Sequence, residues 1–344
     1  MSNLHGVLLL DKPLGLSSYR ALRRAQTLFN VRKAGHGGSL DPLATGLLAI
    51  YFGEALKFCR FSLDSDKYYE VEALLGVQTS TGDAEGAVLV RSPVPLLSIS
   101  ALQTVLATFK GPLDQIPPMH SAIKQEGQPL YKLARAGIVV PRQARTIHIH
   151  ALELLYFEGD ALRLGVRCSK GTYIRTLVED IGKALGCGAH VRSLRRLASG
   201  SYQASGMHTL ESLEQVHQVG GLAALASTLI PLNDLLSDWP AVHLDAEQAR
   251  RLIQGQVISL GTAVLAPSTI PLTAACPYPG ELAEVSCHEP WMPRTSRGTT
   301  DVLYTNQGNS QWLRLNHADG QLLGIGQISE AGQVVPKRLL SMLH

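Results

Sequence analysis

The sequence predicts an α+β protein in which residues 1–240 form a mixed domain of strands and helices and residues 241–344 form a smaller β domain. The length of 344 residues suggests two domains, because one domain holds about 150 residues. Strand-like and helix-like segments succeed each other up to about residue 240, whereas short strand-like runs dominate after it. A stretch at about 261–300 with six prolines is expected to be an irregular insertion in the β domain.

Composition excludes several classes of protein. The apolar runs at 7–10 and 222–230 are shorter than the roughly 18 residues that span a bilayer, so no membrane protein is expected. Asp11 and Lys12 follow the first run without a small-residue cleavage site, so no secretory signal is expected. The five cysteines form no C-x-x-C pair, and no His and Cys cluster has the spacing of metal ligands. We therefore expect a cytoplasmic protein without a metal.

Basic residues are concentrated in the first part of the chain. Residues 1–200 hold 24 Lys and Arg against 16 Asp and Glu, whereas residues 201–344 hold 7 against 12. The excess lies in three segments, at 12–33, 110–145 and 163–196. A solvated surface explains any one of them, but the three together favour a polyanionic partner, because Lys and Arg that meet phosphates release counterions.

The first 75 residues predict two strands around a basic helix, and then a third strand. The run at 7–10 ends in a Pro and Gly turn, after which Ser17 or Ser18 is a plausible N-cap. In the helix that follows, apolar residues recur at helical spacing and arginines occupy the opposite face. A Gly-rich loop leads into an apolar strand at 47–52, and the next strand alternates with Tyr69 on its inward side.

The middle of the chain predicts a helix at 98–110, an exposed basic segment at 110–145 and a strand at 161–169. The basic segment is punctuated by Pro and Gly, which suits a mobile thumb that closes on a ligand. A turn after the strand leads into a helix with a regular apolar stripe. This arrangement places Tyr173 and Arg175 in the first turn of the helix, beside the end of the strand.

Asp41 is the first candidate for chemistry, because the backbone of a Gly-rich turn presents its carboxylate directly before Pro42. A plain turn-initiating Asp is the alternative interpretation. A partner carboxylate is not found nearby, so a two-carboxylate glycosidase is not suggested. His36, five residues earlier, is either a loop contact or a general base.

Five segments in this order and at these separations resemble the bacterial TruB family, the tRNA pseudouridine-55 synthases: DKPLGLSS, AGHGGSLDPLATG, DSDKYYEV, CSKGTYIRTL and CGAHVRSLRRL. The resemblance covers residues 4–240 nearly continuously and extends weakly to the end. It implies a pseudouridine synthase fold, a mixed curved sheet bisected by the active-site cleft, with a C-terminal PUA-like β-barrel domain. It also implies the reaction: the N1–C1′ bond of a T-loop uridine in tRNA breaks, the base turns, and C5 joins C1′, without cofactor or metal.

The resemblance implies roles for single residues. Asp41 occupies the position of the nucleophile, a role an ionised carboxylate can fill at C6 of the base or at C1′ of the ribose. Arg175 occupies the position of the arginine that pairs with this carboxylate and keeps it ionised. Tyr69 matches a tyrosine that stacks on the flipped uracil and takes part in proton transfer. The expected substrate-binding positions are His36, Tyr69, Tyr173, Leu194, Lys12, Lys132 and Arg135.

Of these positions, Lys12 belongs to the first motif, which supports the active-site loop more than it touches substrate. Leu194 has a plain core leucine as its alternative. Lys132 and Arg135 lie in the thumb segment and are not part of the matched motifs. Gly37 departs from the family, which commonly has Thr there, and this leaves the loop with more conformational freedom to lose.

We expect a monomer that acts on tRNA without an obligate protein partner. Two alternatives stay open: an RNA-binding folding helper for tRNA, suggested by the basic segments, and a guide-dependent modifier similar to archaeal and eukaryotic relatives. The absence of long basic tails disfavours the second.

Overall fold

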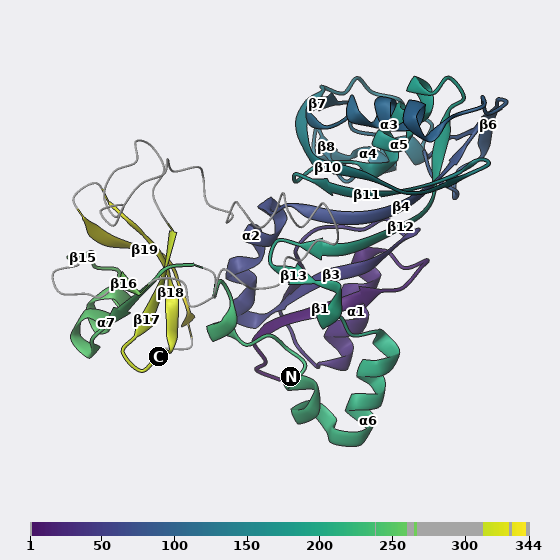
Figure 1. The fold of residues 1–344 in the computed structure, drawn as a ribbon. Coiled ribbons are helices and arrows are strands. Elements are labelled where there is room, and N and C mark those ends of the chain that lie inside the picture. The colour runs from purple at the N-terminus through teal and green to yellow at the C-terminus, as the bar shows by residue number, and fades with distance from the viewer. Residues whose placement is uncertain (1, 238, 260–264, 267–311, 330–331, 342–344) are drawn as a thin grey trace.

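A mixed sheet of nine strands dominates the computed structural model, which describes residues 2–237, 239–259, 265–266, 312–329 and 332–341 (Figure 1). Its main path is β1-β3-β12-β4-β11-β10-β7, with β2 added to β3 and β13 added to β12. The strands are β1 (Gly6–Lys12), β2 (Ala34–His36), β3 (Ala44–Phe52), β4 (Lys67–Leu75), β7 (Gly111–Gln115), β10 (Arg145–Glu158), β11 (Ala161–Cys168), β12 (Ala189–Ser199) and β13 (Tyr202–Gln203).

Strand β12 joins the two halves of this sheet. It runs parallel to β3 on one side and antiparallel to β4 on the other. Residues 189–199 of β12 therefore lie between residues 44–46 of β3 and residues 67–75 of β4, although more than 100 positions separate β12 from both strands in the sequence. The mixed α+β architecture agrees with the predicted fold class.

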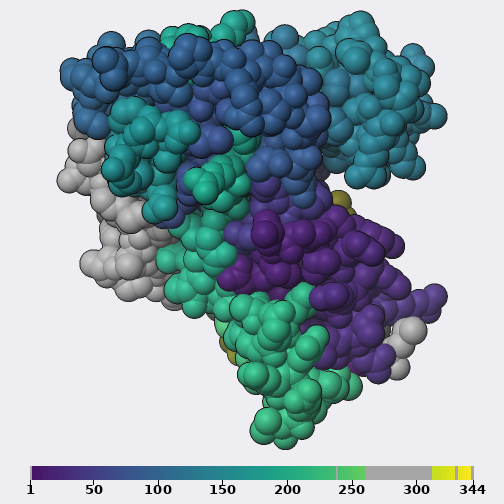
Figure 2. Space-filling model, turned by 90° about the vertical axis from the view of Figure 1, so that its right-hand side faces the viewer, coloured from purple at the N-terminus to yellow at the C-terminus, as the bar shows by residue number. Residues whose placement is uncertain are grey.

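Helices and short ribbons cover the sheet. The helices are α1 (Ser18–Leu28), α2 (Cys59–Asp64), α3 (Ile99–Ala107), α4 (Leu130–Arg135), α5 (Ile174–Ala184) and α6 (Leu210–Ala226), with short 3-10 turns η1 (Gly53–Phe58), η2 (Ala204–Gly206) and η3 (Leu232–Asp234). The ribbons are β5 (Val77–Thr79) with β6 (Val88–Arg91), and β8 (Lys124–Gln125) with β9 (Gln128–Pro129). In Figure 2 the purple N-terminal segment lies between the blue part of the chain above it and the green α6 below.

Local sequence accounts for the elements that position the site. The side chain of Ser17 caps α1 by accepting a hydrogen bond from the backbone N–H of Arg20, as the sequence predicts. In β4, Tyr69 and every second residue after it are buried, which confirms the predicted alternation. The α5 helix buries its apolar stripe against the sheet and begins after Tyr173.

The predicted thumb segment begins differently from the expectation. Its residues Gly111–Gln115 form β7, which pairs with β10 at the end of the sheet. Pro112 is compatible with this place because an edge strand leaves one side of its backbone without ladder hydrogen bonds. The rest of the segment holds the β8–β9 ribbon and α4, and Lys132 and Arg135 are exposed on that helix.

A second sheet of six strands follows residue 240, in the order β15-β19-β18-β17-β14-β16. Its elements are β14 (Ala241–Leu244), α7 (Ala246–Ile253), β15 (Ile258–Ser259), β16 (Leu265–Ala266), β17 (Trp312–His317), β18 (Leu322–Ile328) and β19 (Gln333–Leu339). The predicted strand-like runs fall in β14, β17 and β18, whereas α7 and β19 were not predicted. Apart from β16, the insertion predicted at 261–300 lies outside the described residues.

The short helix α2 lies between the two sheets (Figure 1). The ring of Phe61 on α2 meets Trp239 at 4.8 Å and Trp312 of β17 at 5.3 Å between centroids. Lys57, just before α2, donates from its Nζ to the carbonyl oxygen of Leu339 at 2.6 Å. Aromatic packing and polar contacts therefore join the second sheet to the first.

Candidate active site

The side chains of Asp41 and Arg175 meet although 134 positions separate them in the numbering. Asp41 lies in the loop between β2 and β3, and its Oδ2 is 2.9 Å from Nη2 of Arg175. The Asp41 side chain is 43% exposed, whereas that of Arg175 is 5% exposed. A buried cation therefore holds a carboxylate that still faces solvent and can meet a substrate.

Arg175 is fixed by contacts on its other sides. Its Nη1 donates to the carbonyl oxygen of Thr81 at 2.8 Å and its Nη2 to that of His120 at 2.7 Å. Its Nε lies 3.6 Å from Oδ2 of Asp83, a carboxylate that is 5% exposed. The guanidinium thus bridges a buried carboxylate and an open one. Asp83 was not predicted from the sequence, although, like Asp41, it lies in a short segment that contains glycine.

Residues of β1 and α1 hold the loop on both sides of Asp41. Lys12 has no exposed surface, and its Nζ donates to three carbonyl oxygens, at 2.6 Å to Leu16, 2.9 Å to Pro13 and 3.4 Å to Pro42. Burial lowers the pKa of Lys12 to about 8, although the charge of Asp41 raises it. The hydroxyl of Ser18 donates to the Leu40 carbonyl and accepts from the Leu40 N–H. Lys12 is therefore placed to support the loop.

Gly37, the departure from the family pattern, lies against α2. Ser62 of that helix donates from its Oγ to the carbonyl oxygen of Gly37 at 3.2 Å. A Cβ atom at position 37 would lie 2.4 Å from that Oγ, 2.8 Å from the Ser62 Cβ and 3.0 Å from the Tyr51 ring. Glycine at this position therefore permits the close approach of α2 to the loop that carries Asp41.

Tyr69 and Leu194 lie on the same face of the sheet. Leu194 on β12 is opposite Val71 of β4, two residues from Tyr69, so their side chains share a face. Both Tyr69 and Leu194 are 8% exposed and belong to one core cluster with Leu40 and Ala44, which flank Asp41. Burial raises the pKa of the Tyr69 hydroxyl, and Arg196 opposes this shift.

Tyr173 is held by a buried amide that the sequence did not predict. The backbone N–H of Tyr173 donates to Oε1 of Gln115 at 2.8 Å, and Nε2 of Gln115 donates to the Tyr173 carbonyl at 3.1 Å. Burial raises the pKa of the Tyr173 hydroxyl, and the charge of Asp41 raises it further. Since Gln115 lies in β7, this edge strand helps to fix the start of α5.

The structure groups most of the predicted residues and leaves others apart. The charge of Asp41 acts on both Tyr69 and Tyr173, which places these groups around one site. His36 is half-buried on β2, and burial lowers its pKa. The guanidinium of Arg135 lies 5.7 Å from the centroid of the Tyr131 ring on the same helix, and no contact of that side chain with Asp41 or Arg175 is found among the described residues.

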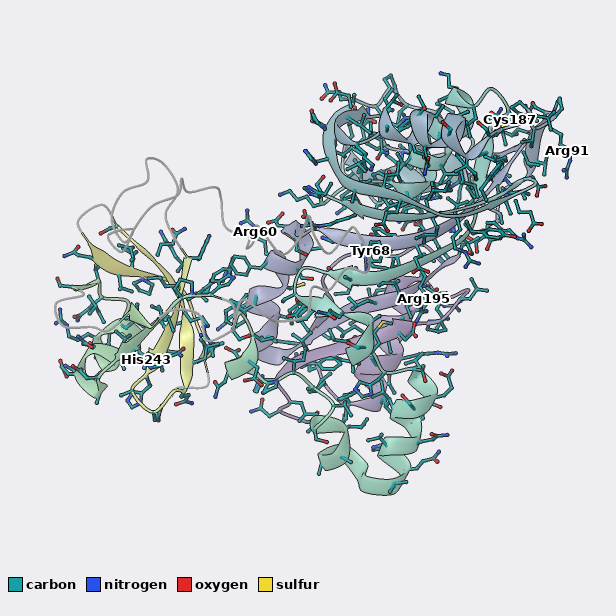
Figure 3. The ribbon with its side chains drawn as sticks, viewed as in Figure 1. Arg60, Tyr68, Arg91, Cys187, Arg195 and His243 are labelled. Carbon is teal, nitrogen blue, oxygen red and sulfur yellow. The ribbon has the colours of Figure 1, made fainter. Side chains whose placement is uncertain are left out.

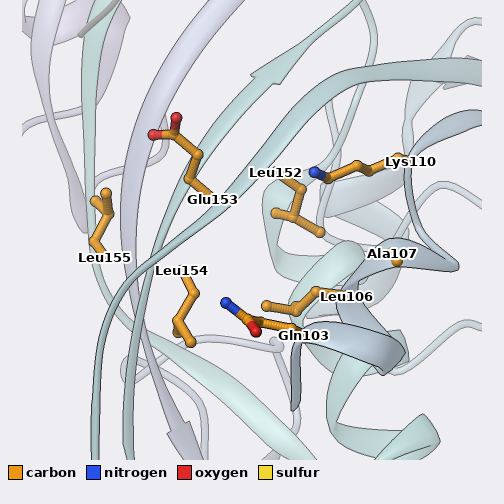
Figure 4. A pocket seen from close by; sticks show the side chains of 8 residues that line it. All are labelled: Gln103, Leu106, Ala107, Lys110, Leu152, Glu153, Leu154 and Leu155. Carbon is orange, nitrogen blue, oxygen red and sulfur yellow. The ribbon is translucent and has the colours of Figure 1, made fainter. Parts of the chain in front are cut away.

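A cavity of about 430 Å³ lies away from this cluster, between α3 and β10 (Figure 4). Its lining residues are Gln103, Leu106, Ala107, Lys110, Leu152, Glu153, Leu154 and Leu155. None of them belongs to the predicted site. Across the described part of the chain, no helix is long and apolar enough to cross a bilayer, and no three His, Cys, Asp or Glu side chains are grouped as metal ligands.

Three family models match the chain. The N-terminal domain of TruB family pseudouridylate synthase matches residues 26–174, and the tRNA pseudouridylate synthase B C-terminal domain matches residues 175–237. A model of the C-terminal part of pseudouridine synthase II TruB matches residues 301–340. Together they reach from α1, through the loop that carries Asp41, to the second sheet.

Curated relatives match over nearly the full length. The chain is 45% identical over 335 residues to a tRNA pseudouridine synthase B of Ectopseudomonas mendocina, with 97% of this chain and 95% of the relative covered. It is 46% identical over 338 residues to that of Pseudomonas putida strain GB-1, with 98% and 96% covered. A solved chain in a Cbf5–Nop10–Gar1 complex has a TM-score of 0.67 at 21% identity, with 97% and 84% covered. That likeness shows a shared fold.

Proposed function

This chain belongs to the TruB family of pseudouridylate synthases, and from that premise we propose that it isomerises the T-loop uridine at position 55 of tRNA to pseudouridine. Relatives that share 45% of its residues carry the name tRNA pseudouridine synthase B. The observation that carries the proposal is the half-open carboxylate of Asp41 on the buried guanidinium of Arg175. This pair supplies an oriented carboxylate as nucleophile in an otherwise buried site.

The reaction exchanges one bond to C1′ for another. The N1–C1′ bond breaks, C5 bonds to C1′, the proton on C5 is lost, and N1 gains a proton. We propose that Asp41 adds covalently and leaves again, at C6 of the base or at C1′ of the ribose. Arg175 orients its oxygens, because Asp83 and two carbonyl groups fix the guanidinium from behind.

The target base must leave the T-loop stack before it can meet Asp41, which costs a few kcal/mol. Tyr69, Tyr173 and Leu194 are proposed to receive it, and the ring of Tyr69 to stack on the uracil. The raised pKa of Tyr69 keeps its hydroxyl protonated at neutral pH, so the group enters the reaction as a neutral partner in proton transfer. His36 is proposed to contact RNA beside the extruded nucleotide.

We propose that residues 1–240 carry the chemistry, that residues 241–344 form an accessory PUA-like domain, and that the protein works as a cytoplasmic monomer on free tRNA. A direct test incubates the purified protein with unmodified tRNA alone and maps pseudouridine with a specific chemical probe. One modified T-loop site supports the proposal. Absence of product without a guide RNA or a protein partner would contradict it, and the mass in solution tests the monomer.

Replacing Tyr69 with Phe tests the hydroxyl separately from the ring. We expect Tyr69→Phe to bind tRNA with wild-type affinity, because the ring is kept, and to lose about 100-fold in single-turnover rate, the usual size of an acid–base contribution. Tyr68→Phe, one residue earlier on β4 (Figure 3), is the matched control with an unchanged rate. An unchanged rate in Tyr69→Phe would reduce Tyr69 to a stacking role.

Replacing Lys132 and Arg135 with Ala tests the thumb. Both side chains are exposed on α4, so we expect weaker tRNA binding and a slope of log affinity against log salt that is shallower by about 0.7 to 0.9 for each phosphate that the protein no longer neutralises. The single-turnover rate at saturating tRNA should change little. Arg91→Ala, on the exposed strand β6, is the control (Figure 3). An unchanged affinity and slope would make these charges a solvated surface.

A further inference from the structure

Arg196 is a fully buried cation beside the proposed site, and its side chain is only 1% exposed. It lies on β12, the strand that joins the two halves of the main sheet. Among the residues that the structure describes, no carboxylate forms an ion pair with it, unlike Arg175. A buried charge without an ionic partner is costly unless hydrogen bonds compensate it. The hydrogen bonds of the guanidinium therefore indicate what a buried arginine does at this position.

Those contacts tie together three parts of the site. Nε donates to the carbonyl oxygen of Leu47 in β3 at 2.7 Å. The two terminal nitrogens donate to the catalytic loop, at 3.2 Å to Gly38 and 3.4 Å to Ser39. Tyr69 of β4 is the residue directly opposite Arg196, and the positive charge of Arg196 acts on the Tyr69 hydroxyl. One guanidinium is thus bound to a strand and to the loop just before Asp41, and its residue lies opposite the tyrosine proposed to act on the base.

The strand register explains how one side chain reaches all three. Arg196 is directly opposite Tyr69 of β4 on one side and Gly46 of β3 on the other. Directly opposite residues of neighbouring strands project to the same face and lie close enough to interact. Gly46 has a φ of +94°, a conformation that favours glycine, and a Cβ there would lie 2.2 Å from the Arg196 carbonyl oxygen. Glycine at this position therefore allows β12 and β3 to approach each other closely.

We propose that Arg196 is a positioning residue of this site, whose guanidinium holds the Tyr69 hydroxyl in fixed relation to the loop that carries Asp41. The proposal rests on the proposed function, because it concerns the same reaction. A planar fork holds its five donors in fixed directions, whereas the ammonium of a lysine is a single point on a flexible stem and cannot reproduce that geometry. The cation also lowers the pKa of Tyr69 against the effect of burial. It therefore favours the state in which this hydroxyl gives up its proton.

A double-mutant cycle tests the link between the two residues. Arg196→Lys keeps the charge and loses the fork, and is measured alone and in the Tyr69→Phe background. With Tyr69 present, we expect a loss of about 10- to 100-fold in single-turnover rate at saturating tRNA, the scale of a slightly misplaced group, and tRNA affinity within threefold. With Phe at position 69, the further loss should be below about threefold, because the hydroxyl that Arg196 positions is already gone.

Arg195→Lys is the matched control on the same strand. Its guanidinium points to solvent, is 41% exposed and pairs with Asp11 at 2.7 Å (Figure 3), so the rate should change less than twofold in both backgrounds. Equal losses from Arg196→Lys with and without the Tyr69 hydroxyl would overturn the proposal, as would no loss at all. Failure of the proposed function is distinct, since the unaltered protein would then form no pseudouridine.

Thermal unfolding checks that Arg196→Lys is folded. If Arg196→Lys does not fold, a second measurement tests the proposal without that variant. It compares the NMR signals of slowly rotating, buried guanidinium groups in the wild-type protein and in Tyr69→Phe. Removing only the hydroxyl should shift one such signal, and Tyr68→Phe should not shift the same one. If no guanidinium signal responds to Tyr69→Phe, the contact is absent and the proposal is wrong.

Discussion

Asp41→Asn is expected to abolish turnover, by at least about 10⁴-fold, while tRNA affinity stays within about threefold of wild type. The amide keeps the shape of the side chain but cannot act as the nucleophile. Arg175 retains its contacts with Thr81, His120 and Asp83, so the site should stay assembled. The loss of tritium from C5-labelled uridine in single-turnover experiments measures the rate, because isomerisation removes the hydrogen on C5.

Asp114→Asn serves as the control for this variant, because Asp114 is an exposed carboxylate on β7. Its rate should match wild type. Turnover of Asp41→Asn within tenfold of wild type would remove Asp41 from the nucleophilic role. The same variant also separates chemistry from tRNA folding: a folding helper would still promote tRNA folding without the carboxylate.

The second large effect is expected for Arg175→Lys, which should lose about 10³-fold or more in single-turnover rate. The guanidinium serves Asp41, Asp83 and two carbonyl oxygens from fixed directions, and a flexible ammonium cannot reproduce that set. Thermal stability should fall as well, because the buried carboxylate of Asp83 loses its partner. Lys183→Arg, on the exposed side of the last turn of α5, is the control.

A paired variant distinguishes the catalytic from the structural part of this loss. Arg175→Met leaves the Asp83 carboxylate buried without its cation, with the Thr81 hydroxyl and the Glu85 N–H still donating to it, whereas Arg175→Met combined with Asp83→Asn removes that charge too. The second change should restore part of the thermal stability and none of the rate. Recovery of the rate would show that Arg175 acts through folding alone, and an Arg175→Lys rate within tenfold of wild type would contradict its pairing role.

Much of the fold could be predicted from local sequence. The Ser17 cap and the apolar stripe define α1, and the alternation around Tyr69 defines β4, because these signals lie within a few residues of each other. The prediction for the first part of the thumb segment was wrong because it too used only local signals. Its Pro and Gly content predicts a loop, but β7 forms because β10 offers it a partner more than 30 positions later.

The supports of the site could not be predicted in this way. Asp83, Gln115 and Arg196 act through contacts that lie far along the chain, for example 58 positions between Gln115 and Tyr173 and 149 between Arg196 and Leu47. Local spacing and composition do not predict such distant pairs, because only the assembled sheet brings the two residues together. The family resemblance predicted that Asp41 and Arg175 form a pair, and in the structure their side chains are in contact.

The close packing of α2 against Gly37 restricts which substitutions this protein can accept at position 37. Thr at position 37, which the resemblance implies for the family, would place its Cβ 2.8 Å from the Ser62 Cβ and 3.0 Å from the Tyr51 ring. Phe61, the neighbour of Ser62, is held by two tryptophans, so α2 cannot simply retreat. The substitution is therefore harmful alone and tolerated only after position 62 has become smaller. We accordingly expect positions 37 and 62 to behave as an epistatic pair.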